Sequence, residues 1–103
     1  MKRHEANALG RAKYQRMWDV TAHVVRKWDP LGLLAGGAPT DEYDQEIASL
    51  VAQIPRIHSA VDAAHAVSRV FVSSFHPQTF SVEICSEAGK TLYVALSEQG
   101  LID

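Results

Sequence analysis

The segment FSVEICSEAGKTLYVALSEQGL, residues 80–101, decides the fold class of this chain because its apolar pattern fits two different structures. With a period of two it is a β-hairpin, in which apolar and polar residues alternate on both sides of the turn-forming EAGK. The alternating residues are Phe80, Val82, Ile84, Leu92, Val94 and Leu96. With a period near 3.6, apolar residues recur at steps of three and four and form one face of a helix.

Signals at both ends of this segment favour the helix. Ser81 is suited to the N-cap, and Gly100 is suited to the left-handed position that ends many helices, with Leu101 making the closing apolar contact. Gly89 in the middle costs about 1 kcal/mol relative to alanine, which a packed helix tolerates. The β-hairpin, at about 79–97, remains the alternative.

The preceding helix is expected at residues 60–75. Ser59 can cap it, and Asp62, three residues on, gives an Asp version of the capping box. Ala60 and Ala64 are small residues early in its apolar stripe. They should allow a close approach to a neighbouring helix.

A second helix is expected at residues 41–54, where Thr40 or Asp41 can serve as the N-cap. Acidic residues fill its first turn, where the positive end of the helix dipole favours negative charge by about 0.3–1 kcal/mol each. Pro55 ends this helix.

Residues 5–28 form the longest expected helix, which is amphipathic. Its apolar stripe consists of Leu9, Tyr14, Met17, Trp18, Thr21, Val25 and Trp28. The aromatic residues of this stripe are expected to pack on the core. Pro30 disfavours the helical conformation at Asp29, so the helix should end there.

The connection at residues 31–39 is rich in glycine but lacks the GK[ST] and GxGxxG patterns of phosphate-binding loops. Its glycines are better explained as turn residues. We expect Leu31, Leu33 and Leu34 to tuck under the helices and anchor this loop.

These patterns predict an all-α, four-helix, bundle-like single domain over residues 1–103; the alternative is an α+β domain with the C-terminal hairpin. The expected helices lie near 5–28, 41–54, 60–75 and 82–98. The chain has 103 residues, of which 47% are hydrophobic, as in a domain with one core.

Location and redox state also follow from composition. No apolar run reaches the ~20 residues of a membrane span, and the N-terminal residues lack the apolar core of a signal peptide. Cys85 is the only cysteine, which excludes an internal disulfide and favours a small buried residue. We therefore expect a cytoplasmic protein.

Charge is distributed unevenly along the chain. Residues 1–28 hold seven Lys or Arg and two acidic residues, which gives +5, whereas residues 29–103 hold three basic and ten acidic residues, which gives −7; the sum is the net charge of −2. A basic end and an acidic body can serve internal complementarity or the docking of a charged partner.

Four segments carry a resemblance to a known family: WDPLGL, DEYDQEI, AAHAVSRVFVSSF and FSVEICSEAGKTL. Over about residues 20–97 the chain resembles the YugE-like family of small bacterial proteins of unknown function. The resemblance implies an all-helical domain and transfers no catalytic residue. The glycine loop and the basic N-terminal extension depart from the family pattern. The WDP and DEYD motifs are also similar to those of small bacterial immunity proteins, a weaker analogy.

The leading functional hypothesis is a non-enzymatic protein-binding module of the immunity or regulatory kind. No catalytic residue, cofactor or metal ligand is assigned, because no nucleophile, base or cofactor motif is recognisable. The binding surface is expected at Asp41, Glu42, Asp44 and Glu46, facing a basic toxin or regulator. A homodimer is compatible with the sequence, and no membrane partner is expected.

Two alternatives belong to other functional classes. The first is a metal-dependent or acid/base enzyme that uses either the acids of residues 41–46 or His58, Asp62 and His65, whose spacings of four and three suit metal ligands on a helix. The second is weak nucleic-acid binding through the basic first helix. Its candidate residues are Lys2, Arg3, Arg11, Lys13 and Arg16.

Overall fold

The computed structural model describes residues 3–75 and 80–102, and the side chains of residues 10–75 and 80–102. The elements are α1 (Arg3–Trp28), α2 (Asp44–Gln53), the 3₁₀ turn η1 (Ile54–Arg56), α3 (Ala60–Ser74) and α4 (Ser86–Glu98). No strand occurs in these described ranges. The all-helical fold is confirmed, and the hairpin alternative is wrong for residues 80–97.

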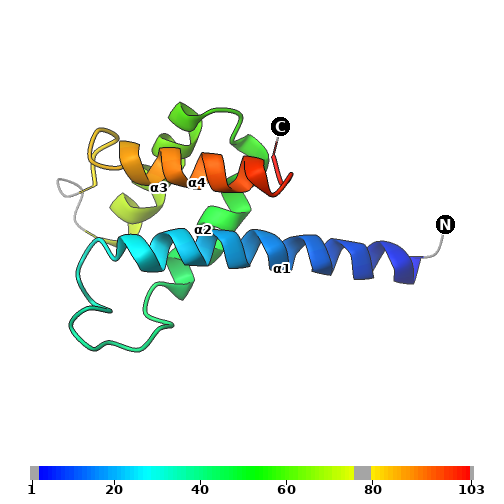
Figure 1. Ribbon diagram of the computed structural model, residues 1–103, viewed down its shortest axis with the longest axis horizontal. Coiled ribbons are helices and arrows are strands. Elements are labelled where there is room, and N and C mark those ends of the chain that lie inside the picture. The colour runs from blue at the N-terminus through cyan, green and yellow to red at the C-terminus, as the bar shows by residue number, and fades with distance from the viewer. Residues whose placement is uncertain (1–2, 76–79, 103) are drawn as a thin grey trace.

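The helices surround one core, and α1 lies along the edge of the group (Figure 1). α4 packs against both α3 and α1, whereas α2 packs against α1 and α3. The blue N-terminal end of α1 extends past the other helices (Figure 1). The long axis of the molecule, 48 Å, therefore follows α1.

Phe71 of α3 lies at the centre of an aromatic cluster that joins four parts of the chain. Its ring centroid is 5.2 Å from both Trp28 and Phe80, 5.8 Å from Phe75 and 6.4 Å from Tyr43. Most of these pairs are tilted or edge-on, the geometries that aromatic quadrupoles favour. The cluster fixes the end of α1 and the start of α2 against α3.

The capping signals of α3 and the C-terminus of α4 act as expected. The Ser59 hydroxyl accepts the Asp62 backbone N–H at 3.1 Å. At the other end, Gly100 has a φ of +67° and the Leu101 N–H donates to the Leu96 carbonyl at 2.9 Å, while the Leu101 side chain is buried. This is the Schellman arrangement.

Two expected helix starts are wrong by a few residues. α2 begins at Asp44 after turns at 40–43, so neither Thr40 nor Asp41 is its N-cap; Tyr43 occupies that position without a side-chain capping bond. α4 begins at Ser86 rather than 82. A separate turn precedes it, in which the Ser81 hydroxyl accepts the Ile84 N–H at 3.3 Å.

The crossing of α3 and α4 depends on Gly89. A Cβ atom at Gly89 would lie 2.5 Å from the N and Cα atoms of Ala64 and 3.0 Å from the carbonyl carbon of Ala63. Such distances are shorter than any ordinary contact between carbon atoms. The small residues of α3 thus permit the close approach that was expected, and glycine in α4 is required by it.

The apolar stripe of α1 is buried only along its C-terminal half. Thr21 and Val25 are buried and Trp28 is half-buried, but Tyr14 is 50% exposed, so its expected packing on the core is wrong. Every side chain from residue 11 to 16 is exposed, because the N-terminal end of α1 extends past the bundle, although Lys13 borders a hollow with Ile54 and Leu101. Leu9, also assigned to the stripe, lies outside the described side chains. No helix of the described ranges combines the length and apolarity needed to cross a membrane.

Candidate functional site

The loop between α1 and α2 is organised around the carboxylate of Asp29. This residue has a φ of +42°, and its N–H still donates to the Val25 carbonyl as the last bond of the helix. Its carboxylate accepts the N–H groups of Leu34 at 3.1 Å and Ala35 at 2.9 Å, and the hydroxyl of Tyr43 at 2.7 Å. One side chain therefore holds both halves of the loop.

Tyr43 closes the loop from its other end. Its side chain is 0% exposed, and its hydroxyl accepts the Leu31 N–H at 3.2 Å while donating to Asp29. Burial, together with the hydrogen bond and negative charge of Asp29, raises the pKa of Tyr43 to about 12. Tyr43 is therefore a neutral donor at any physiological pH.

The pKa of Asp29 is shifted in the opposite direction, below its usual value. Burial raises the pKa of Asp29, but the hydrogen bonds from Ala35, Tyr43 and Leu34 together outweigh burial and hold the pKa below its usual value. The carboxylate is thus charged, and its donors are all within the loop that it stabilises.

The four acids of the expected binding surface occupy different environments. Asp41 and Glu42 are exposed on the turn before α2. Asp44 forms an ion pair with Arg26 of α1, with 3.0 Å between Nη2 and Oδ1. Glu46 is only 5% exposed because it lies on the inner face of α2 with Leu50, one turn further on. The expectation that all four carboxylates face outward is therefore wrong for Glu46.

The expected anchoring of the glycine loop is confirmed in part. Leu33 and Leu34 are half-buried and pack against the core, whereas Leu31 is 38% exposed. The loop thus presents Leu31, Asp41 and Glu42 outward from a frame fixed by Asp29 and Tyr43. We call these three residues the loop surface.

The three residues proposed as a metal site do not act together as ligands. Asp62 is engaged in capping α3, because its Oδ2 accepts the His58 backbone N–H at 2.9 Å. The side chains of His58 and His65 are exposed. In the described ranges 3–75 and 80–102, no three His, Cys, Asp or Glu side chains are placed to hold a metal ion.

The described part of the basic first helix lies open to solvent. Arg11, Lys13 and Arg16 are exposed on the extending end of α1, beside the exposed ring of Tyr14. The side chains of Lys2 and Arg3 lie outside the described set.

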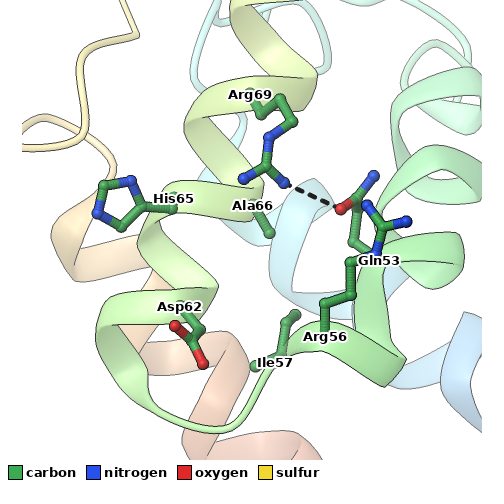
Figure 2. A pocket seen from close by; sticks show the side chains of 7 residues that line it. All are labelled: Gln53, Arg56, Ile57, Asp62, His65, Ala66 and Arg69. Atoms are coloured by element: carbon green, nitrogen blue, oxygen red, sulfur yellow. Dashed lines mark hydrogen bonds between the residues drawn. The ribbon is translucent and has the colours of Figure 1, made fainter.

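A hollow between the C-terminal end of α2 and α3 was not expected from the sequence. It has a volume of about 210 Å³ and two of its lining side chains are arginines, Arg56 and Arg69. Figure 2 shows Arg56 and Gln53 on one wall and Arg69 on the other. The two arginines are 13 positions apart, and the packing of α2 against α3 brings them to the same hollow. The charge balance of residues 29–103, with three basic residues in all, is the one sequence signal that could have singled them out.

Comparison with curated proteins and with solved structures gives no match. Residues 20–100 match the family described as Domain of unknown function (DUF1871). The match includes the loop surface and the hollow beside α3 but starts after the exposed basic part of α1. It agrees with the expectation of a family of unknown function. Since the match spans most of the length of the chain, the chain belongs to this family of unknown function, DUF1871.

Proposed function

We propose that this chain is a non-enzymatic protein-binding module that presents the loop surface to a partner with a basic patch. The observation that carries the proposal is the Asp29–Tyr43 hydrogen bond of 2.7 Å, which fixes an exposed loop. A loop ordered before binding loses less conformational entropy when a partner docks. Leu31 offers such a partner an apolar contact in addition to the charges of Asp41 and Glu42.

Charge supports a basic partner. Residues 29–55 hold five acidic side chains and no Lys or Arg. Arg26 of α1 offsets one of these acids, Asp44, but leaves Asp41 and Glu42 without an ion pair among the described residues. Opposite charge accelerates association and selects partners more than it adds affinity.

The partner class is a basic protein such as a toxin or a regulator. The likeness of WDP and DEYD to motifs of small bacterial immunity proteins adds to this choice. It has less weight than the loop geometry, because the motif residues Asp29 and Tyr43 have a structural role that any function would need.

The test compares two double variants in a pull-down from the native host at low and high salt. Asp41→Asn with Glu42→Gln neutralises the loop surface, and Glu83→Gln with Glu98→Gln makes the same charge change at exposed sites near the ends of α4. We expect a stoichiometric basic protein to be retained by the wild type and the α4 variant and lost by the loop variant. Retention by both variants, or recovery of no stoichiometric protein, would refute the proposal.

Nucleic acid is a second candidate partner because of the exposed end of α1. Arg11, Lys13 and Arg16 are exposed on the same turns as the half-exposed ring of Tyr14, so this end of α1 offers side chains that can bind phosphates and a ring that can stack on a base. Three such contacts predict a slope of roughly −2 in log affinity against log salt for a single strand.

This candidate is tested by fluorescence anisotropy with a labelled single-stranded DNA across about 50–200 mM salt. The double variant Arg11→Gln with Lys13→Gln should make the dependence of affinity on salt less steep, whereas Lys90→Gln on α4 should leave it unchanged. A flat salt response of the wild type would exclude phosphate binding by α1.

A further inference from the structure

The hollow beside α3 contains two arginines without acidic partners. Arg56 and Arg69 form no ion pair in the described ranges 3–75 and 80–102. They lie in a body of net charge −7 with only one other basic residue, Lys90. Acidic side chains are thus abundant in the body, yet none of those that the structure describes pairs with these two guanidinium groups.

Local structure orients these side chains. Asp62, Ala66 and Arg69 lie at steps of four and three along α3, so they form one face of that helix toward the hollow. Arg69 donates from Nη1 to the Gln53 side-chain oxygen at 3.0 Å, which holds its guanidinium across the gap between α3 and α2 (Figure 2).

A second group of residues forms the floor and the opposite wall. Ile57 and Ala66 are buried and give the hollow an apolar floor, and the small side chain of Ala66 leaves it open. Gln53 and Arg56 stand on the opposite wall from Arg69 (Figure 2). The amide nitrogen of Gln53 adds a further donor, since its oxygen is taken by Arg69.

The other charged group at the hollow is Asp62. One of its oxygens accepts the His58 backbone N–H at 2.9 Å, and its own N–H is bound by Ser59, so it belongs to the α3 cap. In Figure 2 the imidazole of His65 points away from Arg56. Two arginines therefore outnumber the single carboxylate.

We propose that this hollow is a binding site for a small oxyanion, the carboxylate or phosphate group of a small molecule, held between Arg56 and Arg69. A guanidinium presents N–H donors in a planar fork that matches both groups. A volume of about 210 Å³ suits a small ligand and is below the ~300 Å³ of typical drug-sized sites. The apolar floor of Ile57 and Ala66 accepts a short hydrocarbon part.

The test titrates the full chain with inorganic phosphate and, separately, with propionate, and follows backbone amide shifts by NMR against sodium chloride of equal ionic strength. We expect saturable shifts of residues at the end of α2 and along α3. Saturation by phosphate alone assigns a phosphate ligand, and saturation by propionate alone assigns a carboxylate. Absence of saturation with both anions would overturn the proposal.

Variants separate a built site from general charge attraction. Arg56→Gln and Arg69→Gln should each weaken binding at least tenfold, which corresponds to about 1.4 kcal/mol. Both side chains are exposed, so these variants should fold, and their melting temperatures check this. Lys90→Gln removes the remaining basic side chain of the body with the same charge change and should leave affinity unchanged. Equal weakening by Lys90→Gln would refute the site.

Discussion

Replacing Gly89 with alanine tests the close approach of α3 and α4. In an open helix this substitution stabilises by up to about 1 kcal/mol, because alanine has the higher helix propensity. At Gly89 the new methyl group would lie 2.5 Å from two backbone atoms of Ala64, against the ~3.5–4.0 Å of a normal contact. Backbone atoms cannot turn aside as a flexible side chain can, so α3 and α4 must separate by about 1 Å.

Overpacking of this kind costs roughly 1–3 kcal/mol and occasionally more. We expect Gly89→Ala to lose about 2–3 kcal/mol, since the contact is with main chain and α3 and α4 form the largest interface of the bundle. For a domain of this size the melting temperature should fall by roughly 10–20 °C. Urea unfolding followed by circular dichroism measures the free energy directly.

Gly10→Ala is the matched control, because Gly10 is also helical but has nothing within 4 Å of a new Cβ atom. It should be neutral or stabilising by up to about 1 kcal/mol. If Gly89→Ala proved as stable as the wild type or Gly10→Ala, the close approach of α3 and α4 would be refuted.

Three further predictions concern the loop, the ion pair and the cysteine. Tyr43→Phe keeps the ring but removes the hydroxyl that joins Asp29 and Leu31, so urea unfolding should show a loss of about 2 kcal/mol. The pKa of Tyr43 is raised from 10.0 to about 12 in the folded protein, so its contribution to stability is complete below pH 10 and is lost as the pH rises from 10 to about 12. Tyr43→Phe should abolish that alkaline loss of stability. An unchanged alkaline profile of the variant would contradict the hydrogen bond to Asp29. Asp44→Asn should cost less than about 1 kcal/mol in the same assay, since its pair with Arg26 is partly exposed, and a larger loss would show that the pair is structural. Burial raises the pKa of the Cys85 thiol, so alkylation by iodoacetamide in native buffer should proceed only as fast as the chain opens; rapid labelling of the folded protein would contradict its burial.

Elements whose ends depend on neighbouring residues could be predicted from the sequence. Ser59 caps α3 through a residue three positions away, and Gly100 ends α4 through residues within the last turn. These bonds form inside a single turn, so residue type and spacing are sufficient to identify them. The end signal at Gly100 and Leu101 favoured a helix over a hairpin in residues 80–101 for the same reason.

Features that depend on distant residues could not be predicted in this way. α2 starts at Asp44 because Tyr43 bonds to Asp29, 14 positions earlier, and this bond sets the course of the turns between them. Helical periodicity placed Tyr14 in the core, but Tyr14 is exposed. The period shows which side of a helix faces its neighbours, but it does not show where those neighbouring helices end. The burial of Glu46 and the meeting of Arg56 with Arg69 also result from helix packing.

The extension of α1 past the bundle should give this helix two rates of amide hydrogen exchange. Its 26 residues span roughly 39 Å at ~1.5 Å per residue, but residues 10–16 have no side chain covered by the core. Amides there should exchange through local fraying, whereas those of residues 21–25 should exchange only when the whole domain unfolds. A partner that bound the extending turns would therefore be detected as slowed exchange there, with the rest of the domain unchanged.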